Sequence, residues 1–389
     1  MPEAILLVST SSRSGLGAEP GRARSSIPGG GFRDSLSMGL ADIIADSDAE
    51  AKREPVSDKQ RRRELARADR VLPGLWRLRL PLPWPGVPHV NAFAVSAGSG
   101  VVLFDTGIGD AGAMRQLELA LGQAGLSVEH IRLVVCTHAH SDHYGLAAPI
   151  LERAGCELWM HFNHEHVTRG AADPDRLLER RLEVARQSGV PRAALERYES
   201  ERRGQGIGVA EVVLPGREIG DGAEVETDLG PWRVHETPGH APSHVVLHQP
   251  ERRLLISGDH VLGRVSLYYD YGWTPDPAGE FLSSLDVVDR LEVSLLLAGH
   301  GRPRRDAHGL VAANRAAVEE RVGRVRAGLR DGAYTPFELV PALLGEEPAS
   351  PMAINWGLSE VLCYLRHLEL RGEARPLEGE DPERWTLAG

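Results

Sequence analysis

Short apolar runs alternate with segments of helical period along most of this chain. The runs predict strands at residues 75–80, 90–95, 101–104, 131–136, 157–160, 212–214, 223–227, 232–236, 245–248, 254–257 and 293–297. Apolar residues at helical spacing predict helices at residues 113–124, 147–154 and 280–291. Strands that alternate with helices in this way are typical of a layered α/β fold.

Two segments stand outside this alternation. Residues 163–208 are strongly charged, with leucines at helical intervals, and predict a helical cap inserted between two core strands. A solvated pair of surface helices is the alternative. His161, His164 and His166 cluster at the start of this segment, without the partners that would mark them as metal ligands.

The second segment is the C-terminal region, which we assign to residues 309–389. Its pattern predicts a long helix at 310–329, two shorter helices at 335–344 and 354–369, and a hairpin of 374–377 with 384–387. Helix, helix and hairpin in this order are typical of a small winged-helix module. Many acidic residues surround the second short helix, so we expect this module to dock on the preceding domain or wall its pocket rather than bind DNA.

Residues 1–69 are rich in Ser, Gly, Arg and Ala and lack a lasting apolar period. We therefore predict a disordered N-terminal extension that is dispensable for chemistry, with order beginning near Pro73. The catalytic domain would then span residues 70–308.

Composition excludes several classes of protein. The net charge of −11 makes nucleic acid an improbable partner for the chain as a whole. The three cysteines lie in or beside apolar runs and predict buried thiols rather than disulfides. No apolar stretch is long enough to cross a membrane, and none fits a signal peptide, so we expect a cytoplasmic protein. A homodimer is compatible with these features.

The chemistry concentrates in four short segments that each follow a predicted strand. They supply five imidazoles and two carboxylates, from His138, His140, Asp142, His143, His240, Asp259 and His300. His138 and His140 are two residues apart, so their side chains leave the same face of an extended segment. Donors at the ends of several strands suit a rigid site for two metal ions that share a carboxylate and a water. Nitrogen and oxygen donors without thiolate fit zinc best, with manganese or iron as alternatives.

Residues 137–143 resemble the His-x-His-x-Asp-His signature of the metallo-β-lactamase superfamily, and the segments at His240, Asp259 and His300 match its later motifs in order. The resemblance covers residues 70–310 and implies an αββα sandwich with metal-dependent hydrolysis. It implies that one ion is held by His138, His140 and His240, and the other by Asp142, His143 and His300, with Asp259 as the bridge. It also implies that Asp105 does not bind a metal ion but orients a ligand. The C-terminal module is similar to that of a β-lactamase-like branch of the superfamily.

We predict that a water shared by the two ions attacks a carbonyl, with Asp142 and Asp259 as the carboxylates of the reactive centre. A metal-bound water or a pocket residue such as Tyr268 or Tyr269 would donate a proton to a leaving alkoxide. His244 and His260 are either supporting or surface imidazoles. The favoured substrate is a small ester, thioester or lactone, as in hydroxyacylglutathione hydrolase. The chain lacks that enzyme's basic terminal helices, so glutathione itself is not expected. A single-stranded RNA endonuclease and a β-lactamase are the alternatives.

Overall fold

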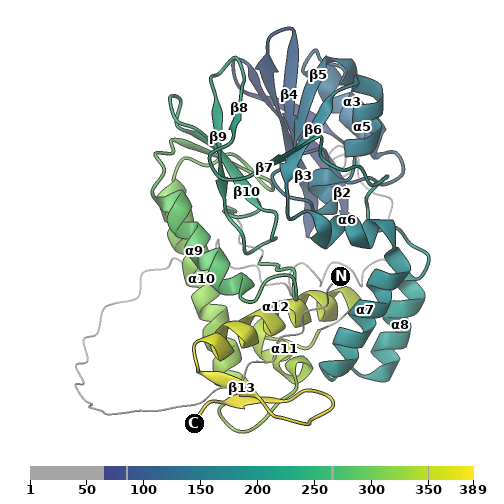
Figure 1. Cartoon of the computed structure of the whole chain (residues 1–389), viewed down its shortest axis with the longest axis vertical. Helices are drawn as coiled ribbons and strands as arrows, with labels where there is room; N and C mark the ends of the chain where they lie inside the picture. Colours follow the sequence, from purple (N-terminus) through teal and green to yellow (C-terminus); the bar gives the residue numbers. More distant parts are fainter. Residues whose placement is uncertain (1–64, 85, 264–266, 349) are drawn as a thin grey trace, which may run out of the picture. The chain divides into compact units, whose positions relative to one another are not determined.

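The computed structural model describes residues 65–84, 86–263, 267–348 and 350–389. The predicted N-terminal extension lies outside the described residues up to position 64. Within the described residues, two β-sheets pack face to face and helices cover their outer sides (Figure 1). This is the αββα architecture that the sequence predicted.

The larger sheet has seven described strands in sequential order, antiparallel at the start and parallel at the end. They are β1 (Arg67–Leu72), β2 (Leu75–Trp84), β3 (Val87–Ala97), β4 (Gly100–Phe104), β5 (Ile131–Val135), β6 (Glu157–His161) and β7 (Arg217–Ile219). The smaller sheet has five described strands in the order β12-β11-β10-β9-β8. They are β8 (Glu224–Val225), β9 (Trp232–Glu236), β10 (Val245–Gln249), β11 (Leu254–Gly258) and β12 (Leu295–Ala298).

Period-two alternation distributes the apolar side chains of each strand between two layers of core. In β2, Leu75 enters the core between the sheets, whereas Leu78 and Leu80 enter the core beneath the outer helices. Those outer helices are η2 (Val128–His130), α3 (Ala113–Gln123) and α5 (Ala147–Ala154). On the other side, α9 (Pro277–Asp289) and α10 (Ala307–Gly328) cover the smaller sheet. Burying both sides of each sheet leaves loops at the sheet edges as the place for polar chemistry.

Two strand predictions need correction. Order begins earlier than Pro73, because β1 pairs antiparallel with β2 from Arg67 onward and Ala66 is already buried. The predicted strand at 212–214 is absent from the described structure. The backbone of Val213 bonds instead to the side chain of Tyr144, whose hydroxyl accepts from its N–H at 2.7 Å and donates to its carbonyl at 2.6 Å. Those groups are therefore not available to a neighbouring strand.

The charged segment at 163–208 forms helices α6 (Glu165–Ala172), α7 (Pro174–Gln187) and α8 (Arg192–Arg202). The Asp173 side chain caps α7 by accepting from the N–H of Arg176, and Pro174 occupies the first turn. All three helices lie within the segment that the sequence predicted to be helical.

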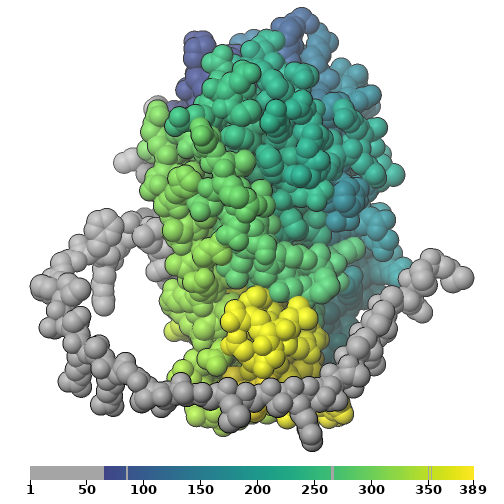
Figure 2. All heavy atoms as spheres, turned by 60° about the vertical axis from the view of Figure 1, so that its left-hand side comes forward, coloured from purple at the N-terminus to yellow at the C-terminus, as the bar shows by residue number. Residues whose placement is uncertain are grey.

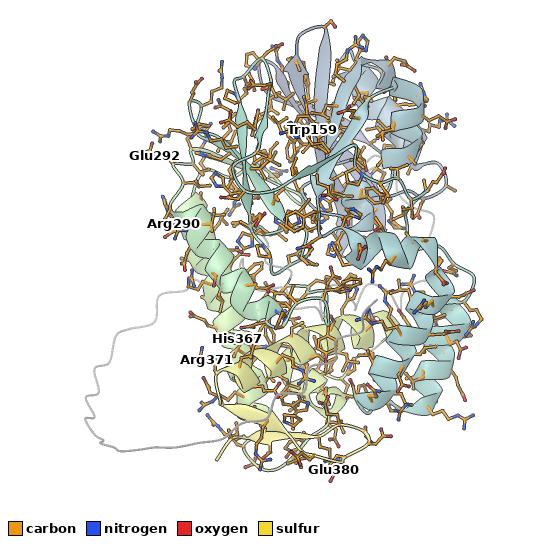
Figure 3. The ribbon with its side chains drawn as sticks, in the orientation of Figure 1. Trp159, Arg290, Glu292, His367, Arg371 and Glu380 are labelled. Atoms are coloured by element: carbon orange, nitrogen blue, oxygen red, sulfur yellow. The ribbon has the colours of Figure 1, made fainter. Side chains whose placement is uncertain are left out.

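The C-terminal region contains α11 (Pro336–Leu344), α12 (Pro351–Leu370) and the antiparallel pair β13 (Ala374–Pro376) and β14 (Trp385–Leu387). Its buried side chains belong to the same core cluster as those of α9 and the smaller sheet. His367 of α12 lies 3.0 Å from the carboxylate of Asp276, which caps α9 (Figure 3). Figure 2 shows these C-terminal residues in yellow beside α10. The winged-helix identity of this region and the predicted domain boundaries stay predictions.

No helix in the described part of the chain has the length and apolar character needed to cross a membrane.

Candidate metal centre

Four sequence segments deliver the candidate ligands, each after a strand. The loop after β5 presents His138 and His140, and the short helix α4 (Ser141–Tyr144) follows with Asp142 and His143. His240 comes after β9, Asp259 after β11 and His300 after β12. A side chain at Gly299 would clash, because a Cβ there would lie 2.2 Å from an oxygen of Asp259. The loops therefore converge on one edge where the two sheets meet.

Three of the predicted ligands form a first group. The nitrogens of His138, His140 and His240 lie close enough together to hold one ion. The Nε2 atom of His240 lies 2.9 Å from the Nδ1 atom of His140. The ring centroids of His138 and His240 are 5.0 Å apart and nearly perpendicular, so the rings face a common point.

The second group contains Asp142, His143, Asp259 and His300. The Nε2 atom of His300 lies 3.0 Å from Asp259 and 3.3 Å from Asp142, and the Nε2 atom of His143 lies 3.4 Å from Asp259. Asp259 also lies 3.8 Å from the Nε2 atom of His240 in the first group. The structure thus brings all seven predicted ligands together, with Asp259 next to both groups.

The hydrogen bonds behind the rings decide which nitrogens face the centre. The Nδ1 atom of His240 lies 2.9 Å from the carbonyl of Tyr268, and that of His300 lies 2.7 Å from the carbonyl of His89. Each of these nitrogens faces an acceptor and carries a ring proton, so Nε2 is the nitrogen that is left to face the centre. The Nε2 atom of His140 donates to Asp270 in the same way, which leaves its Nδ1 atom facing the Nε2 atom of His240.

Several polar atoms at the same positions are buried and lack a hydrogen bond within the described residues. They include His138 Nε2, Asp142 Oδ2, His143 Nε2 and Asp259 Oδ1. Buried acceptors that face one another without a donor are costly, and cations between them remove that cost. The residues present therefore fit two divalent ions, one in each group.

The charge environment differs between the two groups. Burial and neighbouring imidazoles hold the pKa of His138 well below its usual range and lower that of His240 to about 4. These rings are neutral at pH 7 and can act as ligands. Burial opposes protonation of His300, but Asp259 and Asp142 outweigh it and raise the pKa to about 10. The second group therefore attracts positive charge, as protons or as a metal ion.

Asp105 lies directly behind the second group. Its carboxylate accepts from His143 Nδ1 at 2.9 Å and from the N–H of Thr137 at 2.8 Å. The hydroxyl of Thr137 donates to the same carboxylate and lies 3.0 Å from His138 Nδ1. Asp105 adopts a φ of 61°, a left-handed conformation that costs a non-glycine residue about 1–3 kcal/mol. This strained turn after β4 orients imidazoles of both groups.

The sequence analysis assigned no supporting role to Asp270 or His166. Asp270 lies 2.8 Å from His140 Nε2 and 2.8 Å from His166 Nδ1. The second ring nitrogen of His166 is 2.7 Å from the hydroxyl of Ser243, which accepts from the N–H of Ala139. His166 was noted in the sequence, but its partner Asp270 lies more than a hundred positions away and belongs to no recognised motif. Only the fold could join them.

The structure corrects one predicted pocket residue and places three others. Tyr269 is fully buried against Phe281 and Tyr364, away from the cavity beside the ligands, because its side chain leaves the opposite face of the chain from Tyr268. Tyr268 lines that cavity, with its ring 5.6 Å from that of His140. His244 and His260 are buried rather than exposed, and His244 Nε2 accepts from the N–H of Asp259 at 3.0 Å.

A cavity of about 770 Å³ opens beside the two groups. The cap contributes Leu177, Leu178 and Tyr198 to its wall, and α12 contributes Asn355 and Trp356. Cavities of this size accept small organic molecules. Arginines from several elements also line it; they are Arg77, Arg79, Arg181, Arg202 and Arg302.

Comparisons with known proteins agree with this geometry. The chain is 26% identical to the probable metallo-hydrolase YqjP of Bacillus subtilis (strain 168), over 73% of this chain and 91% of that protein. The crystal structure of a metallo-beta-lactamase family protein from Thermus thermophilus superposes with a TM-score of 0.69 at 29% identity, over 82% of this chain and 99% of that one. The hydroxyacylglutathione hydrolase GloC of Haemophilus influenzae is 23% identical over 44% of this chain and 69% of its own length.

The family model that describes the metallo-beta-lactamase superfamily matches residues 85–300. That range is more than half of the chain and contains all seven candidate ligands. This chain belongs to the metallo-β-lactamase superfamily of metal-dependent hydrolases.

Proposed function

We propose that this protein is a dinuclear metal-dependent hydrolase that cleaves an ester, thioester or lactone of a small molecule. The observation that carries the proposal is the convergence of buried ligand atoms from two adjacent groups beside one cavity, several of them without a hydrogen bond to any described residue. Imidazole and carboxylate donors without thiolate favour zinc, with manganese or iron as alternatives. Asp259 is the proposed bridging ligand, because its two oxygens lie next to both groups.

Two divalent ions at these positions would lower the pKa of a bound water and polarise a carbonyl oxygen. The side chains of this protein set the geometry for that chemistry. Asp105 and Asp270 hold the rings of His143 and His140 in fixed orientations, which pre-organises the centre. Tyr268 is the proposed proton donor to a leaving alkoxide. Burial raises its pKa, so the hydroxyl keeps its proton at neutral pH. A leaving thiolate needs no such donor.

The small size of the cavity and its partly apolar wall support an acyl substrate. Leu178, Val167 and Leu262 provide apolar contacts, and one relative, GloC, is named as a hydroxyacylglutathione hydrolase. Trp356 of the C-terminal helix α12 forms part of the wall of this pocket.

Cleavage of single-stranded RNA is the second candidate, because arginines line the cavity and a phosphate backbone would suit them. Turnover of the zinc-loaded protein on thioesters, lactones, nitrocefin and short RNAs tests both. Hydrolysis of a thioester or lactone that stops on chelation supports the proposal. Cleavage of RNA or nitrocefin alone would replace it.

A further inference from the structure

On the inner face of β2, an apolar residue is followed by two arginines as the strand leaves the core. Alternation puts Leu75, Arg77 and Arg79 on the face that looks toward the second sheet. The register with β3 places Arg79 opposite Asn91, at the edge where the ligands gather. Guanidinium groups on the inner face of a sandwich need an anionic or polar partner.

Arg77 has such partners within the protein. Its guanidinium binds Asp69 and donates to the carbonyl of Gly301, next to His300. Arg79 instead contacts the ring of His89, at 3.1 Å, and lies near Arg77 and Arg302. Burial, together with the charge of Arg77, lowers the pKa of Arg79. Positive charge therefore accumulates on this side of the cavity.

Arg181 approaches the cavity from the cap helix α7. Arg181 is partly buried and lies beside Tyr198 and Tyr268. The carboxylate of Asp270 is the negative charge that attracts its guanidinium group. Asp270 already accepts from His140 and His166. No ion pair to Arg181 is formed within the described residues. A half-buried guanidinium whose neighbouring carboxylate is already engaged is suited to bind an external anion.

The mouth of the cavity adds two exposed arginines, Arg202 of α8 and Arg302 after β12. Neither forms an ion pair with a described residue. Four guanidinium groups that line the cavity therefore form no ion pair with a described residue. They belong to Arg79, Arg181, Arg202 and Arg302, in a chain whose net charge is −11. Asp110, Asp142, Asp259 and Asp270 line the same cavity, but the last three already contact imidazoles, so these guanidinium groups are left to attract an anion.

We propose that the substrate of this hydrolase carries an anionic group, a carboxylate or a phosphate, and that Arg181 binds it. Arg79, Arg202 and Arg302 raise the positive potential around the cavity and attract the same group. The proposal rests on the proposed hydrolytic function and narrows its substrate class. Arginine suits this task because its planar fork binds either anion with two parallel hydrogen bonds.

The walls of the cavity favour a small anion over a polymer. Leu177 and Leu178 of the cap, Trp356 of α12 and Tyr268 all line the cavity of about 770 Å³. A strand that runs across the site would need a groove along its backbone, whereas the cap and the C-terminal helix α12 contribute to the walls of this cavity.

The test uses aryl esters that share one scissile bond and differ only at the far end of the acyl chain, which carries a methyl, a carboxylate or a phosphate monoester. The full-length zinc-loaded protein should hydrolyse at least one anionic ester with a kcat/KM about tenfold or more above that of the neutral ester. In Arg181→Gln the preference should fall to about one, and in Arg181→Lys it should be partly retained, because the charge remains without the fork. The control Arg176→Gln, on the same helix but outside the cavity, should keep the full preference.

Calorimetric binding of the corresponding amides separates this proposal from the hydrolytic one. Selective binding of an anionic amide, lost in Arg181→Gln, supports the anion site even if no ester is hydrolysed, and in that case only the proposed function fails. Equal kcat/KM for the neutral and anionic esters in the wild-type protein would overturn the proposal. So would an equal loss on all three esters in Arg181→Gln, or RNA cleavage that depends on Arg181.

Discussion

The Nε2 atom of His140 lies 2.8 Å from the carboxylate of Asp270, and the Nδ1 atom of His166 lies at the same distance from it. Asp270 therefore joins a candidate metal ligand to helix α6 of the inserted cap segment. Through His166, the network continues to Ser243 and back to the N–H of Ala139, between His138 and His140. The cap thus supports the ligand loop in addition to walling the cavity.

Replacing Asp270 by Asn removes the charge that orients His140. Loss of such a supporting acceptor weakens metal binding about 10–100-fold, and we expect an effect of that size here. Competition with a chelator measures it. Asp289→Asn is the matched control, because Asp289 pairs with the exposed His308 rather than with a candidate ligand. Equal affinity in Asp270→Asn and the control would show that His140 does not need this acceptor.

The stability of the metal-free protein should fall as the pH drops below about 6.5. Burial lowers the pKa of His260 to about 3, whereas the unfolded chain binds this proton near pH 6.5. Between these values protonation favours the unfolded state, so the free energy of unfolding decreases toward acid. Denaturant titrations from pH 7 to pH 4 should show a loss that is shallower in His260→Leu, by up to about 1.4 kcal/mol per pH unit. Identical slopes in both proteins would contradict this account.

Gly239→Ala should disturb the loop that carries His240. Gly239 has a φ of 130°, and a Cβ there would lie 2.4 Å from the backbone nitrogen of Phe281 in α9. We expect a loss of about 1–3 kcal/mol in stability and weaker binding at the first group. Gly323→Ala in α10 is the control, since its Cβ would meet no heavy atom within 4 Å, and it should add about 0.5–1 kcal/mol. Thermal unfolding of both variants distinguishes a local steric effect from a general intolerance of alanine.

Trp385→Ala tests whether the C-terminal hairpin is part of the main core. Trp385 is fully buried, and the guanidinium of Arg366 lies 5.0 Å above its ring. Truncation should cost about 3–5 kcal/mol, whereas Leu370→Ala, at an exposed position of α12, should change stability by less than about 0.5 kcal/mol. A small, separate unfolding step in Trp385→Ala, with the remaining transition unchanged, would show that the hairpin folds independently.

Most of the architecture followed from patterns that extend over a few residues. The run before His138 and the run before Asp259 are apolar because β11 is buried throughout and β5 is buried except at Arg132 and, in part, Leu133. Their ends could be placed from composition alone. Residues 212–214 have the same apolar character, yet form no strand. The hydroxyl of Tyr144 bonds to the backbone N–H and carbonyl of Val213, and no local pattern records a partner so far away in the sequence.

The candidate ligands could be predicted for a related reason. Their spacing around His138, and the glycines beside His240 and His300, are local features that a motif can describe. Asp270 and Arg181 have no such signature, because their positions beside His140 and the cavity depend on how the cap returns to the sheets. The prediction that Tyr269 lines the pocket was wrong because the sequence does not show the direction of its side chain. The ring packs against Phe281 instead.

The metal content of the purified protein tests the central claim most directly. Elemental analysis of the wild-type chain should find about two divalent transition-metal ions per molecule, one for each group of ligands. Asp259→Ala should keep the fold, lower the content to about one ion or less, and abolish most hydrolysis, because Asp259 lies next to both groups. One ion in the wild-type protein, or unchanged content and turnover in Asp259→Ala, would contradict the dinuclear account.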